Sequence, residues 1–162
     1  MKSSAFLSVL ATCTSGAVIS ARDTAVDVLP STYSWDVINW QAGLSHGNPN
    51  APQTGWYVFN VSSPETTVDG STVPAFSAQC RGFAENFPVE SPFADCTLSA
   101  GEAGSSVLAR VYPTGDNTQC HMAVSYLTSG SDGIRNLTGY TTKDWARERA
   151  PYNFTITDIE IK

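Results

Sequence analysis

The sequence contains few charged residues, and basic residues are the scarcer kind. Charged side chains make up 15% of the 162 residues, with 9 Lys and Arg against 15 Asp and Glu, for a net charge of −6 at pH 7. Nucleic acids and anionic membranes attract basic patches, so we expect neither as a partner. A chain with so little charge is typical of a secreted β-protein rather than a helical cytosolic one.

The sequence also lacks the residue patterns of metal and catalytic sites. Histidine occurs only at His46 and His121, and no C-x-x-C or H-x-x-x-H spacing is present for zinc. A G-x-S-x-G elbow, a Gly-rich phosphate loop and an H-E-x-x-H motif are absent as well. We therefore expect no metal, no cofactor and no enzymatic activity.

No apolar run is long enough for a permanent membrane span, which requires roughly 20 residues. The nearest candidate follows Lys2, where residues 5–11 are mostly apolar and small residues dominate positions 15–21. This pattern predicts a secretory signal peptide over residues 1–21, with cleavage between positions 17 and 22. We therefore expect a secreted, extracellular protein in which residues 22–162 form a single domain.

What the sequence does contain is a series of short segments in which apolar and polar residues alternate. Such alternation indicates strands with one buried face. The predicted strands are residues 33–40, 55–62, 74–80, 105–112, 118–127, 135–141 and 152–161, the last with a phase change near Asp158 that indicates a bulge or bend. Strands at this spacing predict an all-β fold, a compact antiparallel β-barrel or sandwich. Helix formers between Thr142 and Pro151 predict one short helical segment near residues 142–150.

Three cysteines remain once Cys13 leaves with the signal peptide. In an oxidising compartment we expect Cys80 and Cys96 to form a disulfide, with a pairing to Cys120 as the alternative. Cys120 precedes His121, but consecutive strand residues point to opposite faces, so the two side chains diverge and form no catalytic pair. Cys120 shares its face with apolar residues, and we predict a buried free thiol there.

Asparagine-linked glycosylation is predicted at three sequons. They are Asn60-Val61-Ser62, Asn136-Leu137-Thr138 and Asn153-Phe154-Thr155. A sugar on Asn60 would require the opposite face of its strand to point inward.

Two groups of residues are candidates for binding. The first is a basic island, Lys143, Arg147 and Arg149 with Trp145, on an otherwise acidic protein. The second is an exposed Trp for sugar stacking, for which Trp40 and Trp56 are the better candidates, because Trp35 and Trp40 are five residues apart and are expected on opposite strand faces. Contact loops are also expected at His46 and Asn48 and at residues 85–92.

Part of the pattern resembles a known family. The residues are the run YSWDVINW from Tyr33 to Trp40, then Phe59-Asn60-Val61, Phe76 with Cys80, and Phe93 with Cys96. In this order they resemble small secreted fungal proteins of the Alternaria major allergen family. The resemblance implies a compact antiparallel β-barrel or sandwich in which Cys80 and Cys96 tie neighbouring strands. It also implies a non-catalytic role as an effector or elicitor that meets host-plant proteins.

We accordingly predict a secreted, non-enzymatic effector, elicitor or allergen-like protein that recognises a host or other extracellular protein at the host or cell-wall interface. Two alternatives stay open. One is a carbohydrate-binding module that uses exposed Trp side chains on cell-wall polysaccharide. The other is a small secreted glycoside hydrolase, whose two carboxylates would come from Glu85, Glu90, Asp95, Asp158 and Glu160.

Overall fold

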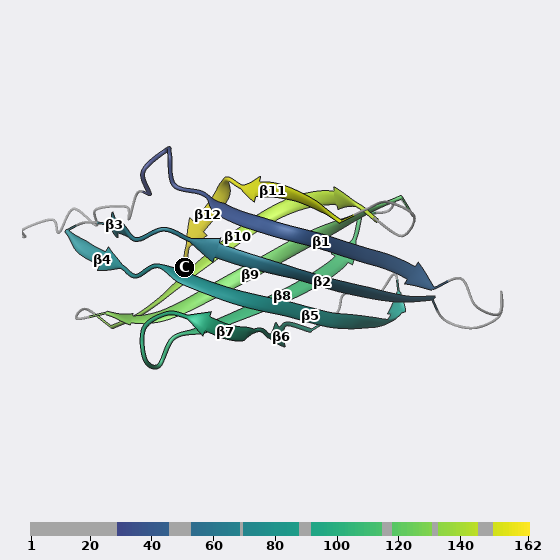
Figure 1. Cartoon of the computed structure of the whole chain (residues 1–162), viewed down its shortest axis with the longest axis horizontal. Coiled ribbons are helices and arrows are strands. Elements are labelled where there is room, and N and C mark those ends of the chain that lie inside the picture. Colours follow the sequence, from purple (N-terminus) through teal and green to yellow (C-terminus); the bar gives the residue numbers. More distant parts are fainter. Residues whose placement is uncertain are drawn as a thin grey trace, which may run out of the picture.

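The chain forms two five-stranded antiparallel sheets packed face to face, with a two-stranded hairpin at one end (Figure 1). The computed structural model describes residues 29–45, 53–68, 70–87, 92–114, 118–130, 133–145 and 151–162. The predicted signal peptide lies outside them. The first sheet has the order β11-β1-β2-β5-β7, the second β12-β10-β9-β8-β6, and β3 pairs with β4. The strands are β1 (Trp35–Ser45), β2 (Gln53–Ser63), β3 (Thr66–Val68), β4 (Ser71–Val73), β5 (Phe76–Phe87), β6 (Ala94–Asp95), β7 (Thr97–Ala100), β8 (Ser106–Pro113), β9 (Gln119–Gly130), β10 (Gly133–Asp144), β11 (Tyr152–Ile156) and β12 (Asp158–Ile161).

The all-β prediction is confirmed, and the sandwich describes the fold better than a closed barrel. Every predicted strand segment overlaps an observed strand. The helical prediction is wrong for its first residues, because β10 continues to Asp144 and pairs Lys143 with Cys120 of β9. Residues 146–150 of that segment lie outside the described residues. The described residues include no helix of the length and apolarity that a membrane crossing requires.

Both seams between the sheets are bridged by a chain segment that leaves one sheet and enters the other. On one side β6 pairs with β8 of the second sheet, and β7, one residue later, pairs with β5 of the first. On the other side β11 pairs with β1 and β12 pairs with β10. The break between β11 and β12 at Thr157 confirms the bend predicted near Asp158. Strands that change sheets at a bend are the usual corners of such packings.

Aromatic side chains from both sheets fill the core. Trp35 of β1 meets the ring of Phe76 edge-on at 5.3 Å, and Phe76 stacks at 4.3 Å on Tyr126 of β9. Tyr57 crosses from β2 to donate a hydrogen bond of 2.7 Å to the Ala109 carbonyl of β8. Its ring occupies the space where a Cβ at Gly82 would lie, which accounts for glycine at that position. The two sheets are therefore joined by both apolar and polar contacts.

A bulge in β1 reverses which residues face the core. Ile38 and Asn39 together lie opposite Asn153 of β11, and Asn39 has a φ of 58°. One extra residue changes the parity of a strand. Val37 is buried before the bulge, and Trp40 is buried after it. Asn is among the few residues that adopt this left-handed conformation without a large penalty, because its short polar side chain can hydrogen-bond locally.

We expect Asn39→Val to lower the free energy of unfolding by about 1–2 kcal/mol, since a β-branched residue is strained at positive φ. Asn39→Gly is the control, because glycine adopts this φ freely and should leave stability within about 0.5 kcal/mol of the wild type. Urea unfolding followed by circular dichroism measures both values. Equal stability of the Val and Gly variants would contradict the role of the bulge.

Candidate functional site

The outer face of the second sheet carries aromatic and cationic side chains. In β8 the residues alternate, so that Val107, Ala109 and Val111 are buried while Arg110 and Tyr112 are half-buried on the outside. Their neighbours on β9, on β10 and beside β6 and β12 continue the group. We call this group the aromatic–cationic face, and its members are Phe93, Arg110, Tyr112, His121, Tyr140 and Lys162.

Arg110 lies at the centre of the aromatic–cationic face. Its guanidinium carbon is 4.5 Å from the ring centroid of Phe93 and 5.3 Å from that of Tyr112. Both Arg110 and Tyr140 are cross-strand partners of Ala123, which is fully buried although it points outward. Cation–π contacts of this kind restrict the arginine side chain. A restricted side chain loses less conformational entropy when a partner binds.

A second row of side chains crosses the sheet next to Arg110. Tyr112 is the cross-strand partner of His121, with ring centroids 4.9 Å apart. His121 Nδ1 and the hydroxyl of Thr142 share a hydrogen bond of 2.8 Å. Burial raises the pKa of the Tyr112 hydroxyl, and the nearby Arg110 charge opposes that rise. These contacts fix the orientation of both rings.

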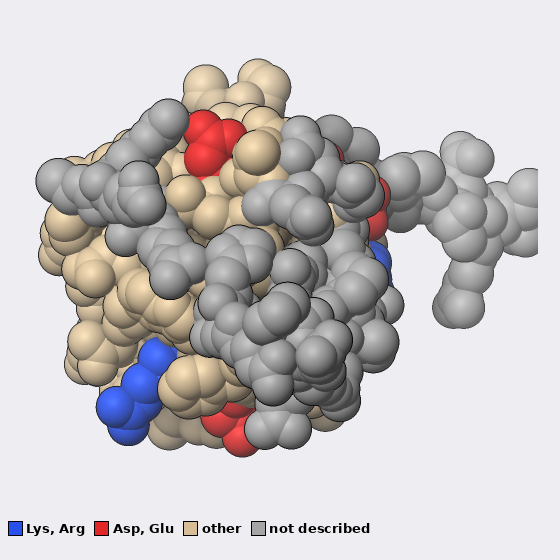
Figure 2. All heavy atoms as spheres, turned by 90° about the vertical axis from the view of Figure 1, so that its right-hand side faces the viewer, with Lys and Arg blue, Asp and Glu red and all other residues tan. Residues whose placement is uncertain are grey.

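The charges around the aromatic–cationic face are mixed. Lys162 donates a hydrogen bond to the Tyr140 hydroxyl and lies 4.0 Å from a Glu160 carboxylate oxygen. At one end of the sandwich the described charged side chains are also scattered rather than gathered in one patch (Figure 2). Among the described residues, no group of three His, Cys, Asp or Glu side chains is arranged to hold a metal ion.

The described part of the predicted basic island, Lys143 and Trp145, lies at a seam between the two sheets. The Lys143 ammonium lies 4.3 Å from the ring centroid of Phe154, and Trp145 is partly buried against the core. The carbonyl of Asp144 accepts hydrogen bonds from Trp40 and Tyr152 at the same seam. Arg147 and Arg149 lie outside the described residues. Lys143 and Trp145 therefore help close the seam, and their side chains are only half-exposed.

The two predicted sugar-stacking tryptophans differ in exposure. Trp40 is fully buried, so the expectation that it is exposed is wrong, and the bulge at Asn39 is the reason. Trp56 is half-exposed on the outer face of the first sheet. A Cβ at Gly43 would lie within 3.2 Å of the Trp56 ring, so the indole lies directly over this glycine. Phe83, the cross-strand partner of Trp56, is 73% exposed.

The predicted disulfide between Cys80 and Cys96 is confirmed, and it secures a corner of the sandwich. The S–S bond joins β5 to the residue between β6 and β7, where the chain changes sheets. The N–H of Cys96 still donates to the Val107 carbonyl of the second sheet at 2.8 Å. Cys96 is therefore bonded to both sheets at once.

Cys120 is a buried free cysteine, as predicted. Its thiol lies 3.6 Å from the carbonyl oxygen of Lys143, and burial raises the pKa to about 12. His121 points away from it towards Thr142. A thiolate is the reactive form of cysteine, so this thiol is poorly suited to nucleophilic chemistry.

Native protein at pH 8 should therefore react only slowly with iodoacetamide. After denaturation without reduction, Cys120 should be alkylated while Cys80 and Cys96 are not, which peptide mass spectrometry measures. Because the folded-state pKa exceeds the ordinary value of 9.0, the stability contributed by the neutral thiol is complete below pH 9.0 and is lost as the pH rises towards about 12. Rapid alkylation of Cys120 in the native state would contradict its burial.

The three predicted glycosylation sites lie on strands. Asn60 is half-exposed on β2, and Asn153 is exposed on β11. Asn136 on β10 has its side-chain oxygen bound by the hydroxyls of Ser125 and Thr138, at 2.7 and 3.3 Å. Thr138 itself is only 3% exposed. The three sequons therefore have different surroundings, although their tripeptides are alike.

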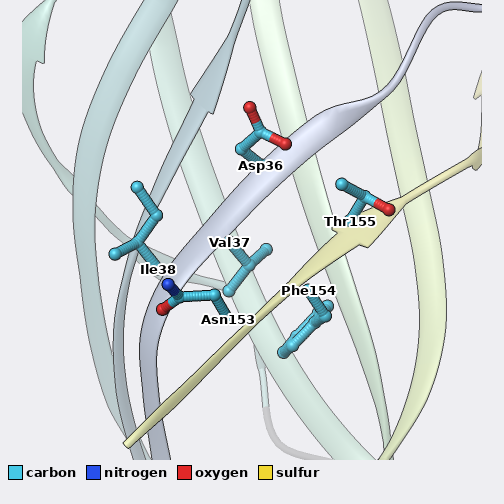
Figure 3. A pocket seen from close by; sticks show the side chains of 6 residues that line it. All are labelled: Asp36, Val37, Ile38, Asn153, Phe154 and Thr155. Atoms are coloured by element: carbon cyan, nitrogen blue, oxygen red, sulfur yellow. The ribbon is translucent and has the colours of Figure 1, made fainter.

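A shallow hollow of about 350 Å³ lies on the outer face of the first sheet, between β1 and β11 (Figure 3). Asp36, Ile38, Asn153 and Thr155 contribute the side chains around it. It contains one carboxylate, whereas glycoside hydrolysis uses two. Asp95, Asp158 and Glu160 are exposed elsewhere, and the predicted contact residues His46, Asn48 and Glu90 lie outside the described residues.

The prediction from sequence did not find the aromatic–cationic face. The signal was present, because alternation in residues 105–112 places Arg110 and Tyr112 on the outward side once Val107 and Val111 are assigned to the core. Phe93 lies outside every strand that the sequence predicts. It contacts Arg110 because the neighbouring strand β6 pairs with β8.

Comparison with known proteins found no relative. No protein-family profile, no curated protein and no solved structure matches the chain. The resemblance to the Alternaria allergen family therefore rests on the spaced aromatic residues and cysteines alone.

Proposed function

We propose that the protein is secreted and acts by binding another protein through the aromatic–cationic face. The observation that carries this proposal is the Arg110 guanidinium held over the rings of Phe93 and Tyr112. Arginine and tyrosine are enriched among the residues that contribute most to protein–protein binding. The contacts of Arg110 with the two rings order this side chain before a partner binds, which favours recognition.

Secretion is supported by two features of the chain. The predicted leader at residues 1–21 would direct it out of the cell. The Cys80–Cys96 disulfide is compatible with an oxidising compartment. Because the chain resembles secreted fungal allergens, we propose an extracellular protein of a plant host as its partner. The protein would then act as an effector or elicitor without enzymatic activity.

We expect Arg110→Glu to abolish capture of the partner from the extracellular fluid of host tissue. Loss of a central arginine contact costs about 2 kcal/mol or more, which is roughly a thirtyfold rise in Kd. Arg81→Glu is the matched control, because Arg81 is exposed on the outer face of the first sheet and the charge change is the same. Quantitative mass spectrometry of the captured proteins, followed by titration with the purified partner, measures the difference.

Both variants must first show the wild-type circular dichroism spectrum and urea midpoint, which separates binding from folding. The proposal fails if Arg110→Glu captures the same partner as strongly as the wild type. It also fails if Arg81→Glu is the variant that loses binding.

Binding of cell-wall polysaccharide is a second candidate, and Trp56 favours it. This indole lies over Gly43 beside the exposed Phe83, an arrangement suited to stacking on a sugar ring. Pull-down on chitin, cellulose and β-glucan with the wild type and Trp56→Ala tests it. Retention of the wild type together with loss of the variant would favour this function over protein binding.

A further inference from the structure

Two of the three sequons lie on the outer face of the first sheet, on the two strands that flank β1. On β2, Asn60 is the cross-strand partner of Ile38, and Ser62 is the partner of Asp36. On the opposite side of β1, Thr155 of β11 is also a partner of Asp36, and Asn153 lies opposite Ile38 and Asn39. Alternate residues of a strand point to the same face, so each Asn shares its face with its own Ser or Thr. The two sequons are thus parallel and in register, with Ile38 and Asp36 between them.

The bulge in β1 orients the Asn153 side chain. Within the bulge, the N–H of Asn39 donates a hydrogen bond of 2.9 Å to Asn153 Oδ1. An asparagine amide has one oxygen acceptor and one nitrogen. An N-linked sugar is joined to the amide nitrogen, so a glycan on Asn153 leaves this hydrogen bond to Oδ1 intact.

The hollow beside Asn153 offers a place for the first sugar. Ile38 is 42% exposed there, and Asp36 and Thr155 add a carboxylate and a hydroxyl to the same surface (Figure 3). A sugar over this hollow would cover the apolar side chain and could hydrogen-bond to the two polar ones. The hollow is thus suited chemically to a pyranose with both an apolar and a polar side.

We propose that Asn60 and Asn153 both carry N-linked glycans, and that this pair covers the outer face of the first sheet around Ile38. The two strands are two inter-strand spacings apart, so the glycans are rooted roughly 10 Å from each other. The aromatic–cationic face lies on the other sheet, so this pair of glycans leaves it uncovered. The inference rests on the proposed secretion of the protein, and it does not depend on the proposed binding face.

The modification is a group transfer from a lipid-linked oligosaccharide pyrophosphate, catalysed by a transferase of the secretory pathway. The asparagine amide nitrogen forms a bond to C1 of the first N-acetylglucosamine, and the C1–oxygen bond to the lipid pyrophosphate breaks. The lipid pyrophosphate leaves with the electron pair of that bond, and the amide nitrogen gives up one proton. No redox change occurs.

Occupancy is measured on the full chain made in a yeast secretion host and purified from the medium. A leader supplied by the host precedes the chain, so occupancy is read even if residues 1–21 do not direct secretion. Enzymatic deglycosylation in ¹⁸O-labelled water converts each occupied Asn to labelled Asp, which peptide mass spectrometry locates. We expect the label at Asn60 and at Asn153, and an intact mass that falls by at least two glycans.

Matched variants assign each glycan to its site. Thr155→Ala keeps the Asn153 side chain and should remove one glycan, whereas Thr155→Ser keeps the sequon and should remove none. Ser62→Ala and Ser62→Thr form the corresponding pair for Asn60. Absence of the label from either Asn60 or Asn153 in the secreted protein would overturn the proposal, as would labelling of Asn136 alone. Partner capture plays no part in this readout, so a failure here is distinct from a failure of the proposed binding face.

Discussion

Trp35→Ala should lower the free energy of unfolding by about 3–5 kcal/mol, the usual cost of removing a large buried aromatic side chain. Trp35 is fully buried and contacts Phe76 edge-on at 5.3 Å. A Cβ on Gly139 of β10 would lie 3.1 Å from its ring, so the indole is packed directly against the opposite sheet. The cavity left by alanine would open between the two sheets, where the backbones cannot collapse easily. Urea unfolding followed by circular dichroism measures the loss.

Ile38→Ala is the control for this substitution. Ile38 lies on the same strand but is 42% exposed, so its truncation should change the free energy of unfolding by about 0.5 kcal/mol or less. A loss below about 1 kcal/mol for Trp35→Ala would contradict its position in the core, because truncation of a fully buried aromatic exceeds that value.

Replacing both Cys80 and Cys96 by Ala should lower the free energy of unfolding by about 2–5 kcal/mol. The bond closes a loop between residues 16 positions apart, and it does so at the corner where the chain passes from the second sheet to the first. Without the bond, the unfolded chain gains conformational entropy. The short strands β6 and β7, which have few ladder contacts of their own, also lose a covalent link to β5. The position of Phe93 beside Arg110 depends on the same corner.

Reduction of the wild type with dithiothreitol provides an independent check on the double substitution. The reduced wild type and the Ala variant should unfold at similar urea concentrations, and adding the reductant to the variant should change nothing. Equal stability of oxidised and reduced wild-type protein would contradict the structural role of the disulfide.

The main strands and the core were predictable because alternation reports directly which residues are buried. Phe59 and Val61 on β2 and Met122 and Val124 on β9 are buried as their period-2 pattern indicates. The burial of Cys120 on β9 follows from the same pattern. These segments are central strands with one face on the core, the situation in which alternation is most regular.

The burial of Trp40 was not predictable from alternation, because a bulge changes the phase within a strand. The bulge with its positive φ at Asn39 moves Trp40 to the side of Trp35, and an Asn in the sequence does not by itself specify a positive φ. The hollow between β1 and β11 lies beside this bulge.

The short strands were missed for a different reason. Strands β3, β4, β6 and β7 have two to four residues each, too few to show a period. Their residues are mostly Ser, Thr and Ala, so they contain few of the large apolar residues that mark a buried face. The aromatic–cationic face depends on one of these strands, because β6 brings Phe93 to Arg110.

Side-chain footprinting of the complex with the captured partner tests the proposed binding face most directly. Hydroxyl radicals oxidise accessible aromatic side chains, and mass spectrometry gives the rate for each peptide with and without the partner. Burial of the aromatic–cationic face predicts that oxidation of Phe93, Tyr112 and Tyr140 falls in the complex, while Trp56 and Phe83 on the opposite sheet react as in the free protein. Protection of Trp56 and Phe83 with unchanged oxidation of Phe93, Tyr112 and Tyr140 would contradict it.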